Sequence, residues 1–163
     1  MIDQEEYLIS YANLKSNLFN YQNDFLDNQN LHKFYKNQFM GVPICLPKGI
    51  KFFDYSNANY FKIDQSKFSK YIFSTNKIDY IGNKKFFRYG NQFATNVLLK
   101  KKYYKKFKFY LANVEKTRKI ILNLKKKKQR ICSMQIRNAP HFGHEAVFKY
   151  ILNRFDLLIL NPI

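Results

Sequence analysis

The sequence predicts an α+β chain with a helical start, a β-rich middle region and a βαβ unit at its end. Apolar residues recur at helical spacing through the first forty residues. Short apolar runs alternate with turn-forming residues from position 44 to about 129, and two longer runs flank a helical pattern after 130. A chain of 163 residues allows one compact domain, or a small domain and part of another.

The first forty residues predict two helices. Four apolar residues share one face of the first helix: Tyr7, Tyr11, Leu14 and Leu18. Apolar residues between Phe25 and Tyr35 indicate a second, shorter helix, with Asp27 or Asn28 as its N-cap. The segment 41–43, which contains Gly and Pro, then ends the helical pattern.

The middle region predicts short strands that would form a small mixed barrel or sandwich. Asn, Asp, Gly and Ser separate the apolar runs, as is usual for turns. We expect strands at residues 44–46, 51–55, 60–63, 70–73, 107–111 and 119–122.

The last thirty-four residues predict a βαβ unit. A strand is expected at Ile131–Ile136, then a turn, with Asn138 or Ala139 near the helix cap and Pro140 in the first helical turn. The helix should continue to about Asn153. The apolar run at 156–161 is typical of a strand buried on both faces of a parallel sheet.

The composition is strongly basic. Twenty-nine Lys and Arg against eleven Asp and Glu give a net charge of 29 − 11 = +18. Enrichment in Lys, Asn, Tyr, Phe and Ile along the whole chain also fits a drift toward A- and T-rich codons. Only the clusters at 100–108 and 125–130 therefore indicate a binding surface for anions.

Other features of the composition exclude several classes of protein. Cys45 and Cys132 form neither a disulfide framework nor a metal-binding pattern. No apolar stretch approaches the roughly 18 residues that a membrane span needs, so no membrane partner is expected. The start of the chain is acidic where a secretory signal is basic, and we expect a cytoplasmic protein.

One motif contains residues that are typical of a phosphate-binding site. His141 and His144 lie three residues apart at a predicted helix start, where free N–H groups and the helix dipole favour phosphate. Gly143 between them would let a nucleotide approach the backbone. Gln135 and Arg137 share a face of the preceding strand. Read alone, the histidines could also be surface residues, or part of a metal site that carboxylates would have to complete.

The motif resembles a known family. Residues 135–145, which read QIRNAPHFGHE, resemble the ATP-binding signature QTRNPxHRxHE of ATP sulfurylase (sulfate adenylyltransferase). Residues 157–163 resemble the strand that ends in LLxHPxVG in that family. Weaker similarity is found at 25–26, 42–47 and 110–113.

The resemblance implies a fold and an activity. Residues 1–129 would be a PUA-like N-terminal domain, and residues 130–163 the truncated start of a Rossmann-like catalytic nucleotidyltransferase domain. That family joins ATP and sulfate into adenylyl sulfate and pyrophosphate in sulfate assimilation. Its later GRDH-like motif has no counterpart in this sequence. We therefore expect the front part of a transferase, inactive unless a second polypeptide or a longer chain supplies the rest.

The resemblance also implies roles for individual residues. Gln135 and Arg137 would contact sulfate. Nucleotide contacts would come from Asn138, His141, Gly143 and His144. Arg137 and Asn138 would be the catalytic pair. Mg-ATP would be a substrate, and neither a tightly bound cofactor nor a metal site in the protein is expected.

Two alternatives remain open. The first is a basic PUA-like RNA-binding module, in which both lysine clusters follow phosphates while Tyr103, Tyr104 and Phe107 stack on bases. The second is another nucleotidyltransferase with an HxGH motif. The residues Gln135, Arg137 and Asn138 before the motif favour the sulfurylase type instead.

Overall fold

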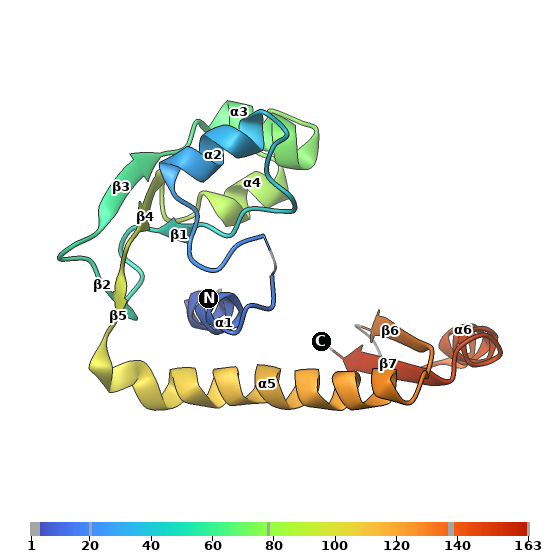
Figure 1. Ribbon diagram of the computed structural model, residues 1–163. Coiled ribbons are helices and arrows are strands. Elements are labelled where there is room, and N and C mark those ends of the chain that lie inside the picture. Colours follow the sequence, from blue (N-terminus) through green and yellow to red (C-terminus); the bar gives the residue numbers. More distant parts are fainter. Residues whose placement is uncertain (1–3, 20, 78, 137–138, 163) are drawn as a thin grey trace. The chain divides into compact units, whose positions relative to one another are not determined.

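A computed structural model describes residues 4–19, 21–77, 79–136 and 139–162 (Figure 1). The chain divides into two compact units, Met1–Val114 (unit 1) and Glu115–Ile163 (unit 2). The division falls inside helix α5 (Tyr104–Lys126). The structure is α+β, with 46% helix and 16% strand. The expected dominance of β-structure before residue 130 is therefore wrong.

The two predicted N-terminal helices are confirmed as α1 (Glu5–Lys15) and α2 (Asn28–Tyr35). The placement of Leu18 on the apolar face of the first helix is wrong, because α1 ends before Leu18 and this side chain is exposed. Helix α1 buries Leu8, Ala12 and Leu14 completely. Helix α2 begins where Asp27 accepts a 2.6 Å hydrogen bond from the backbone N–H of Asn30. Such a cap satisfies one of the free donors at the helix start.

The strands of unit 1 are short and antiparallel. Within the described part of the unit they are β1 (Leu46–Pro47), β2 (Phe53–Asp54), β3 (Asn59–Lys62), β4 (Gln92–Thr95) and β5 (Leu98–Leu99). One sheet has the order β1-β4-β3, and β2 pairs with β5. The described strands form no closed barrel.

The strand expected at 70–73 is wrong, because this segment is the end of helix α3 (Gln65–Phe73). The Asp64 side chain caps α3 by accepting a 2.9 Å hydrogen bond from the N–H of Lys67. Helix α4 (Ile81–Phe86) follows, and Phe86 stacks on the buried Phe68 with ring centroids 4.2 Å apart. The packing of this aromatic pair stabilises α3, although the residues at 70–73 favour a strand locally.

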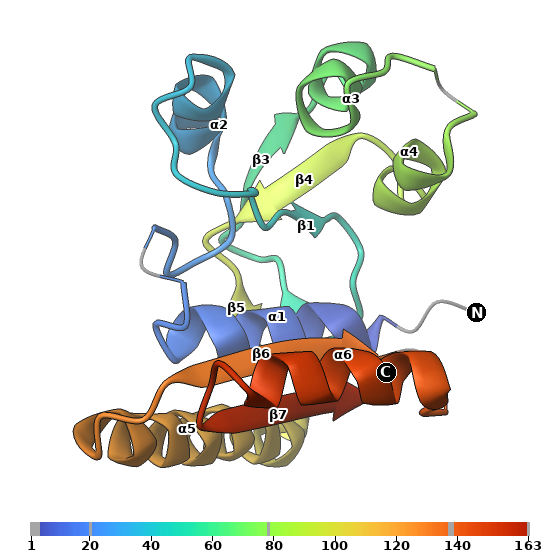
Figure 2. The same cartoon turned by 90° about the vertical axis from the view of Figure 1, so that its right-hand side faces the viewer.

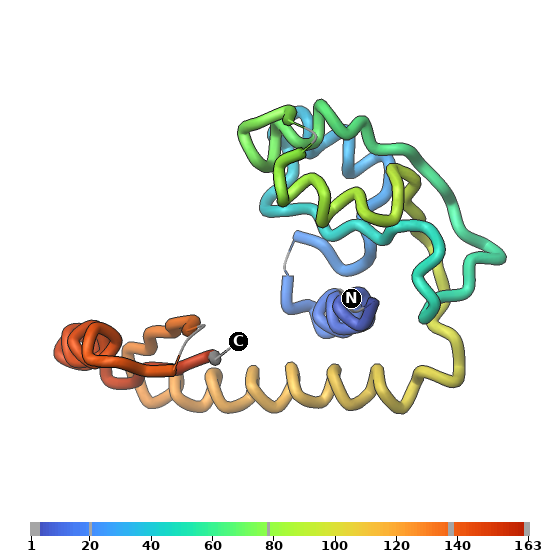
Figure 3. The backbone as a smooth tube through the Cα atoms, turned by 180° about the vertical axis from the view of Figure 1, so that it is seen from behind, coloured from blue at the N-terminus to red at the C-terminus, as the bar shows by residue number. Residues whose placement is uncertain are grey.

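The strands expected at 107–111 and 119–122 are also wrong, because both segments lie in α5. Figure 3 traces α5 as one continuous helix. Its half-buried apolar residues recur at helical spacing, three, four, seven, fourteen and seventeen positions after the first: Phe107, Tyr110, Leu111, Val114, Ile121 and Leu124. A period of about 3.6 residues over this length favours helix over strand.

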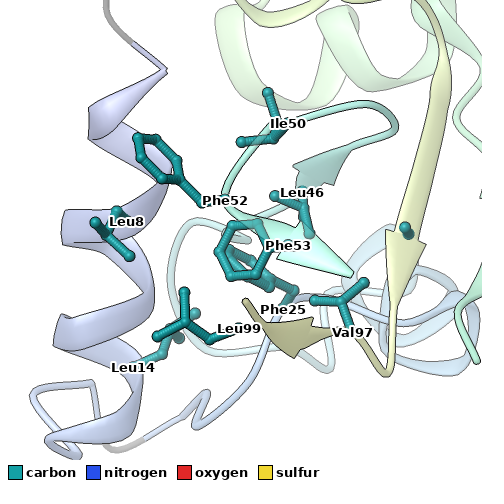
Figure 4. Close-up of a cluster of buried hydrophobic side chains, with 10 residues drawn as sticks. Leu8, Leu14, Phe25, Leu46, Ile50, Phe52, Phe53, Val97 and Leu99 are labelled. Carbon is teal, nitrogen blue, oxygen red and sulfur yellow. The ribbon is translucent and has the colours of Figure 1, made fainter. Parts of the chain in front are cut away.

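The core of unit 1 consists of two apolar clusters. The larger one surrounds Phe53, which lies between α1 and the short strands (Figure 4). The Phe53 ring meets those of Tyr11 and Phe25 edge-on, with centroids 5.3 and 5.4 Å apart. The second cluster contains Leu26, Leu31, Cys45, Phe61, Ile63, Phe68 and Phe93. Aromatic packing therefore supplies much of the buried surface that the short strands cannot provide.

The predicted βαβ unit is confirmed in unit 2. Strand β6 (Ile131–Ile136) pairs in parallel with β7 (Leu157–Pro162), and α6 (Phe142–Leu152) connects them (Figure 2). The expected burial of the second strand on both faces is not found. Leu157, Leu158 and Ile159 are half-buried and Leu160 is 39% exposed.

The start of α6 also differs from the expectation. The N-cap is His141, whereas Asn138 or Ala139 was expected to lie near the cap. Pro140 precedes the cap and does not lie in the first turn. The imidazole of His141 accepts a backbone hydrogen bond, and this interaction sets the helix start.

Arg130 and Asp156 join the beginnings of β6 and β7. The Asp156 carboxylate accepts a 2.7 Å hydrogen bond from the backbone N–H of Arg130, and the guanidinium approaches it to 3.5 Å. The N–H of Asp156 donates back to the Arg130 carbonyl at 2.9 Å. These contacts lower the pKa of Asp156 below its usual 3.8. The hydrogen bond from the backbone N–H of Arg130 has the largest effect, and the Arg130 side chain adds to it.

We predict that Asp156 titrates below 3.8 in the folded chain and returns to the usual value in urea. A pKa lowered by folding stabilises the folded state above the unfolded pKa, and this contribution is lost as the pH falls through the folded value. Carbon-detected NMR of the side-chain carboxyl measures both midpoints. Arg130→Ala should leave most of the shift, because the backbone donor remains. A folded midpoint at or above 3.8 would contradict the contact.

Candidate functional site

The chemistry-bearing motif lies where β6 leads into α6. His141 is extended and caps the helix, and its Nδ1 accepts a hydrogen bond from the N–H of Gly143 at 3.1 Å. An imidazole that accepts at Nδ1 carries its proton on Nε2 when neutral. The exposed His141 ring can therefore donate a hydrogen bond from Nε2 to an anion.

His144 lies beside His141, as their spacing predicts. The ring centroids are 4.1 Å apart and the ring planes are inclined by 53°. Nδ1 of His144 is buried and has no hydrogen-bond partner among the described residues. On its other side the His144 ring meets Phe148 at 6.0 Å. The pair therefore consists of the exposed His141 imidazole and the His144 imidazole, whose buried Nδ1 has no partner among the described residues.

Gly143 lies close against the His141 ring in this arrangement. A Cβ at position 143 would lie 3.0 Å from Cε1 and 3.2 Å from Nδ1 of His141. A side chain would therefore crowd the ring that caps the helix. The role expected for Gly143 was close approach of a nucleotide, and the group that approaches it in this structure is the His141 ring.

The amide groups of the first turn leave donors for a ligand. The N–H of Gly143 is used by His141, and the N–H of Glu145 donates to the His141 carbonyl at 3.1 Å. The N–H groups of Phe142 and His144 donate to no other described residue. Together with the helix dipole, these free donors favour a negatively charged group at this end of α6.

A hollow of about 460 Å³ adjoins the helix start. Its described lining is Pro140, His141, Phe142, Glu145 and Phe148. Phe142 is 90% exposed, so its ring is available to a ligand. Glu145 would repel an anion, but the ammonium group of Lys149 lies 2.7 Å from its carboxylate and offsets that charge.

Gln135, another predicted site residue, lies near the end of β6. Gln135 is exposed and stands opposite Asn161 of β7 in the parallel register. Gln135 is not among the described residues that line the hollow. Arg137 and Asn138, the predicted catalytic pair, lie outside the described residues. The structure therefore places His141, Gly143 and His144 together at the start of α6. It shows no contact of Gln135 with the described lining of the hollow.

The sequence did not single out Pro140, Phe142, Glu145 and Phe148 as lining a hollow. Phe148 follows His144 by one helical turn, so helical periodicity could have placed it there. No sequence pattern predicts that the Phe142 ring is exposed at the site, because aromatic residues are common throughout this chain.

Two of the three aromatic residues that would stack on RNA bases pack against the core of unit 1 instead. The Tyr103 ring packs edge-on against Phe52 at 4.8 Å, and the Phe107 ring lies 5.4 Å from that of Tyr11. Both side chains pack against the larger core cluster of unit 1. Tyr104 remains exposed. The predicted three-residue stacking platform is therefore not available.

Comparison with known proteins identifies no family for this chain. No protein-family model matches the chain, and no curated protein matches it either. The described residues contain no group of three or more His, Cys, Asp or Glu side chains placed to hold a metal ion. No described helix is both long and apolar enough to cross a membrane.

Proposed function

We propose that the βαβ unit is the phosphate-binding part of a sulfate adenylyltransferase site. The observation that carries this proposal is the His141–His144 pair at the N-terminus of a helix that connects two parallel strands. In open α/β folds, ligands bind beyond the carboxyl ends of the strands, where such helices begin. Residues 135–145 resemble the ATP-binding signature of that family in addition.

The donors at this helix start suit the phosphates of ATP. Nε2 of His141 is a donor at one end of α6, as are the N–H groups of Phe142 and His144, which have no partner among the described residues. Hydrogen bonds to a charged phosphate are stronger than those between neutral groups. A hollow of about 460 Å³ lies within the range of small-molecule sites, which is roughly 300–1,000 Å³.

The proposed reaction needs orientation more than proton transfer. A sulfate oxygen attacks the α-phosphorus of ATP, the bond to the bridging oxygen breaks, and pyrophosphate leaves with its magnesium ion. Both reactants are anions, so the protein must hold them in line and neutralise their charge. In this proposal Gln135 and Arg137 hold sulfate, while Asn138, His141, Gly143 and His144 contact the nucleotide. Arg137 and Asn138 then stabilise the transition state.

We further propose that this chain alone does not complete the reaction. The described part of unit 2 has only two strands and one helix after α5. Parallel sheets normally need more strands and cover on both faces. A second polypeptide or a longer chain would supply the remaining contacts, and unit 1 would correspond to the PUA-like domain of the family.

Binding of Mg-ATP tests the site directly. We predict that replacing His141 and His144 together by Ala weakens binding about 10- to 150-fold, the effect of losing one or two hydrogen bonds to charged groups. Isothermal titration calorimetry measures the affinity. His32→Ala is the matched control, because His32 is exposed on α2 in unit 1, and it should bind as the unmodified chain does.

His141→Asn separates ligand binding from helix capping. Asn is a good N-cap, so this variant should keep α6 while it lacks the Nε2 donor. If His141→Asn folds normally and binds Mg-ATP weakly, His141 contacts the nucleotide. Undiminished binding by both the Asn variant and the double variant would contradict the proposed site.

Turnover tests the second part of the proposal. The purified chain with ATP, magnesium and sulfate should release no pyrophosphate, because each missing transition-state donor costs about 2.7–4 kcal/mol. A coupled pyrophosphate assay measures this. Adding a polypeptide that carries the remainder of such a catalytic domain should restore activity. Sulfate-dependent release by the chain alone, abolished in Arg137→Ala, would show that the chain is complete as an enzyme.

A further inference from the structure

Helix α5 carries five lysines on one face, defined here as the lysine face: Lys105, Lys108, Lys116, Lys119 and Lys126. At about 100° per residue, these positions fall within an arc of roughly 80° around the helix axis. Ala112 and Asn123 occupy the same arc and are small and neutral. All five lysines are exposed. The face is a row of positive charge along one helix, interrupted at Ala112 and Asn123.

These lysines differ from the basic residues that have partners. Lys106 lies 2.6 Å from Glu5, and Arg130 pairs with Asp156. In the part of the chain that the structure describes, no lysine of the lysine face has a carboxylate within 4.0 Å. Glu115 is the one acidic residue in the sequence of α5. The charge of the face is therefore available to an external anion.

The pattern favours a nucleic acid over a membrane surface. A membrane-bound amphipathic helix presents a continuous apolar face that enters the lipid. In α5 the apolar face is half-buried, and its first part packs against the core of unit 1 through Phe107 and Tyr110. The exposed large apolar residues of α5 are Tyr104, Phe109, Ile120 and Leu122. Tyr104 and Leu122 lie on one side of the lysine face and Phe109 and Ile120 on the other, so they form no continuous apolar face.

We propose that the lysine face of α5 binds the phosphate backbone of a nucleic acid, independently of base sequence. The face extends about 32 Å from Lys105 to Lys126, enough to follow several successive phosphates. Lysine ammonium groups act as point charges toward phosphate and read no base edges. Tyr103 and Phe107 pack into unit 1, so the rings of α5 that remain exposed for stacking on bases are Tyr104 and Phe109. This proposal uses residues outside the nucleotide site and does not depend on it.

Salt-dependent binding of an oligonucleotide tests the proposal. The probe is a fluorescein-labelled oligothymidylate of about 20 nucleotides, longer than a typical single-strand site. Five phosphate contacts at about −0.7 each predict a slope near −3.5 for the logarithm of affinity against the logarithm of salt concentration. Changing all five lysines to Gln should remove most of this slope. Gln keeps the helix propensity of Lys, so α5 should remain folded.

The control variant removes the same charge elsewhere. Five exposed lysines of unit 1 change to Gln together: Lys36, Lys62, Lys70, Lys84 and Lys85. This variant should retain the slope of the unmodified chain. Equal losses in both variants would show that net charge alone attracts the probe, which would overturn the proposal. A second experiment measures binding of the unmodified chain to vesicles of phosphatidylcholine and phosphatidylserine. Tighter binding to these vesicles than to the oligonucleotide would also overturn the proposal.

Discussion

Parallel pairing of β6 with β7 is the constraint on which the candidate site depends. Two parallel strands cannot be joined by a tight hairpin, so the chain must cross over from the end of one strand to the start of the next. Helix α6 makes that crossover, and its N-terminus therefore follows the carboxyl end of β6. His141 stands at this point and His144 one turn later. The contacts between Arg130 and Asp156 fix the opposite ends of the strands.

A different interaction, aromatic packing, holds unit 1 together. Its strands contain only two to four residues each in the described chain, so backbone pairing provides few hydrogen bonds. Rings such as Phe53 and Phe68, both almost fully buried, supply the apolar area instead. The same packing draws Tyr103 and Phe107 inward. Because those two rings are half-buried, the lysines of α5 are the main groups that can bind a polyanion, and Tyr104 and Phe109 are its exposed rings.

The sequence predicts the βαβ unit well because each part has a strong local signal. The apolar run at 157–160 and the helical spacing before it do not depend on distant contacts. The sequence fails for α5, where short runs of β-favouring residues lie within a longer helical period. It also misses β4 and β5, whose pairing depends on distant partners. The neighbouring histidines follow from their spacing, but the capping role of His141 depends on the backbone at Gly143 and could not be predicted.

The central claim is that the start of α6 holds phosphate, and NMR titration with magnesium pyrophosphate tests it most directly. Pyrophosphate carries the phosphate chemistry of ATP without the base, so its contacts report the helix start alone. The account predicts that the largest amide shifts occur at Phe142, Gly143 and His144, with saturation at one equivalent bound. Shifts confined to the lysines of α5, with the amides of α6 unmoved, would contradict it. Pyrophosphate would then be attracted by general charge and not by a site.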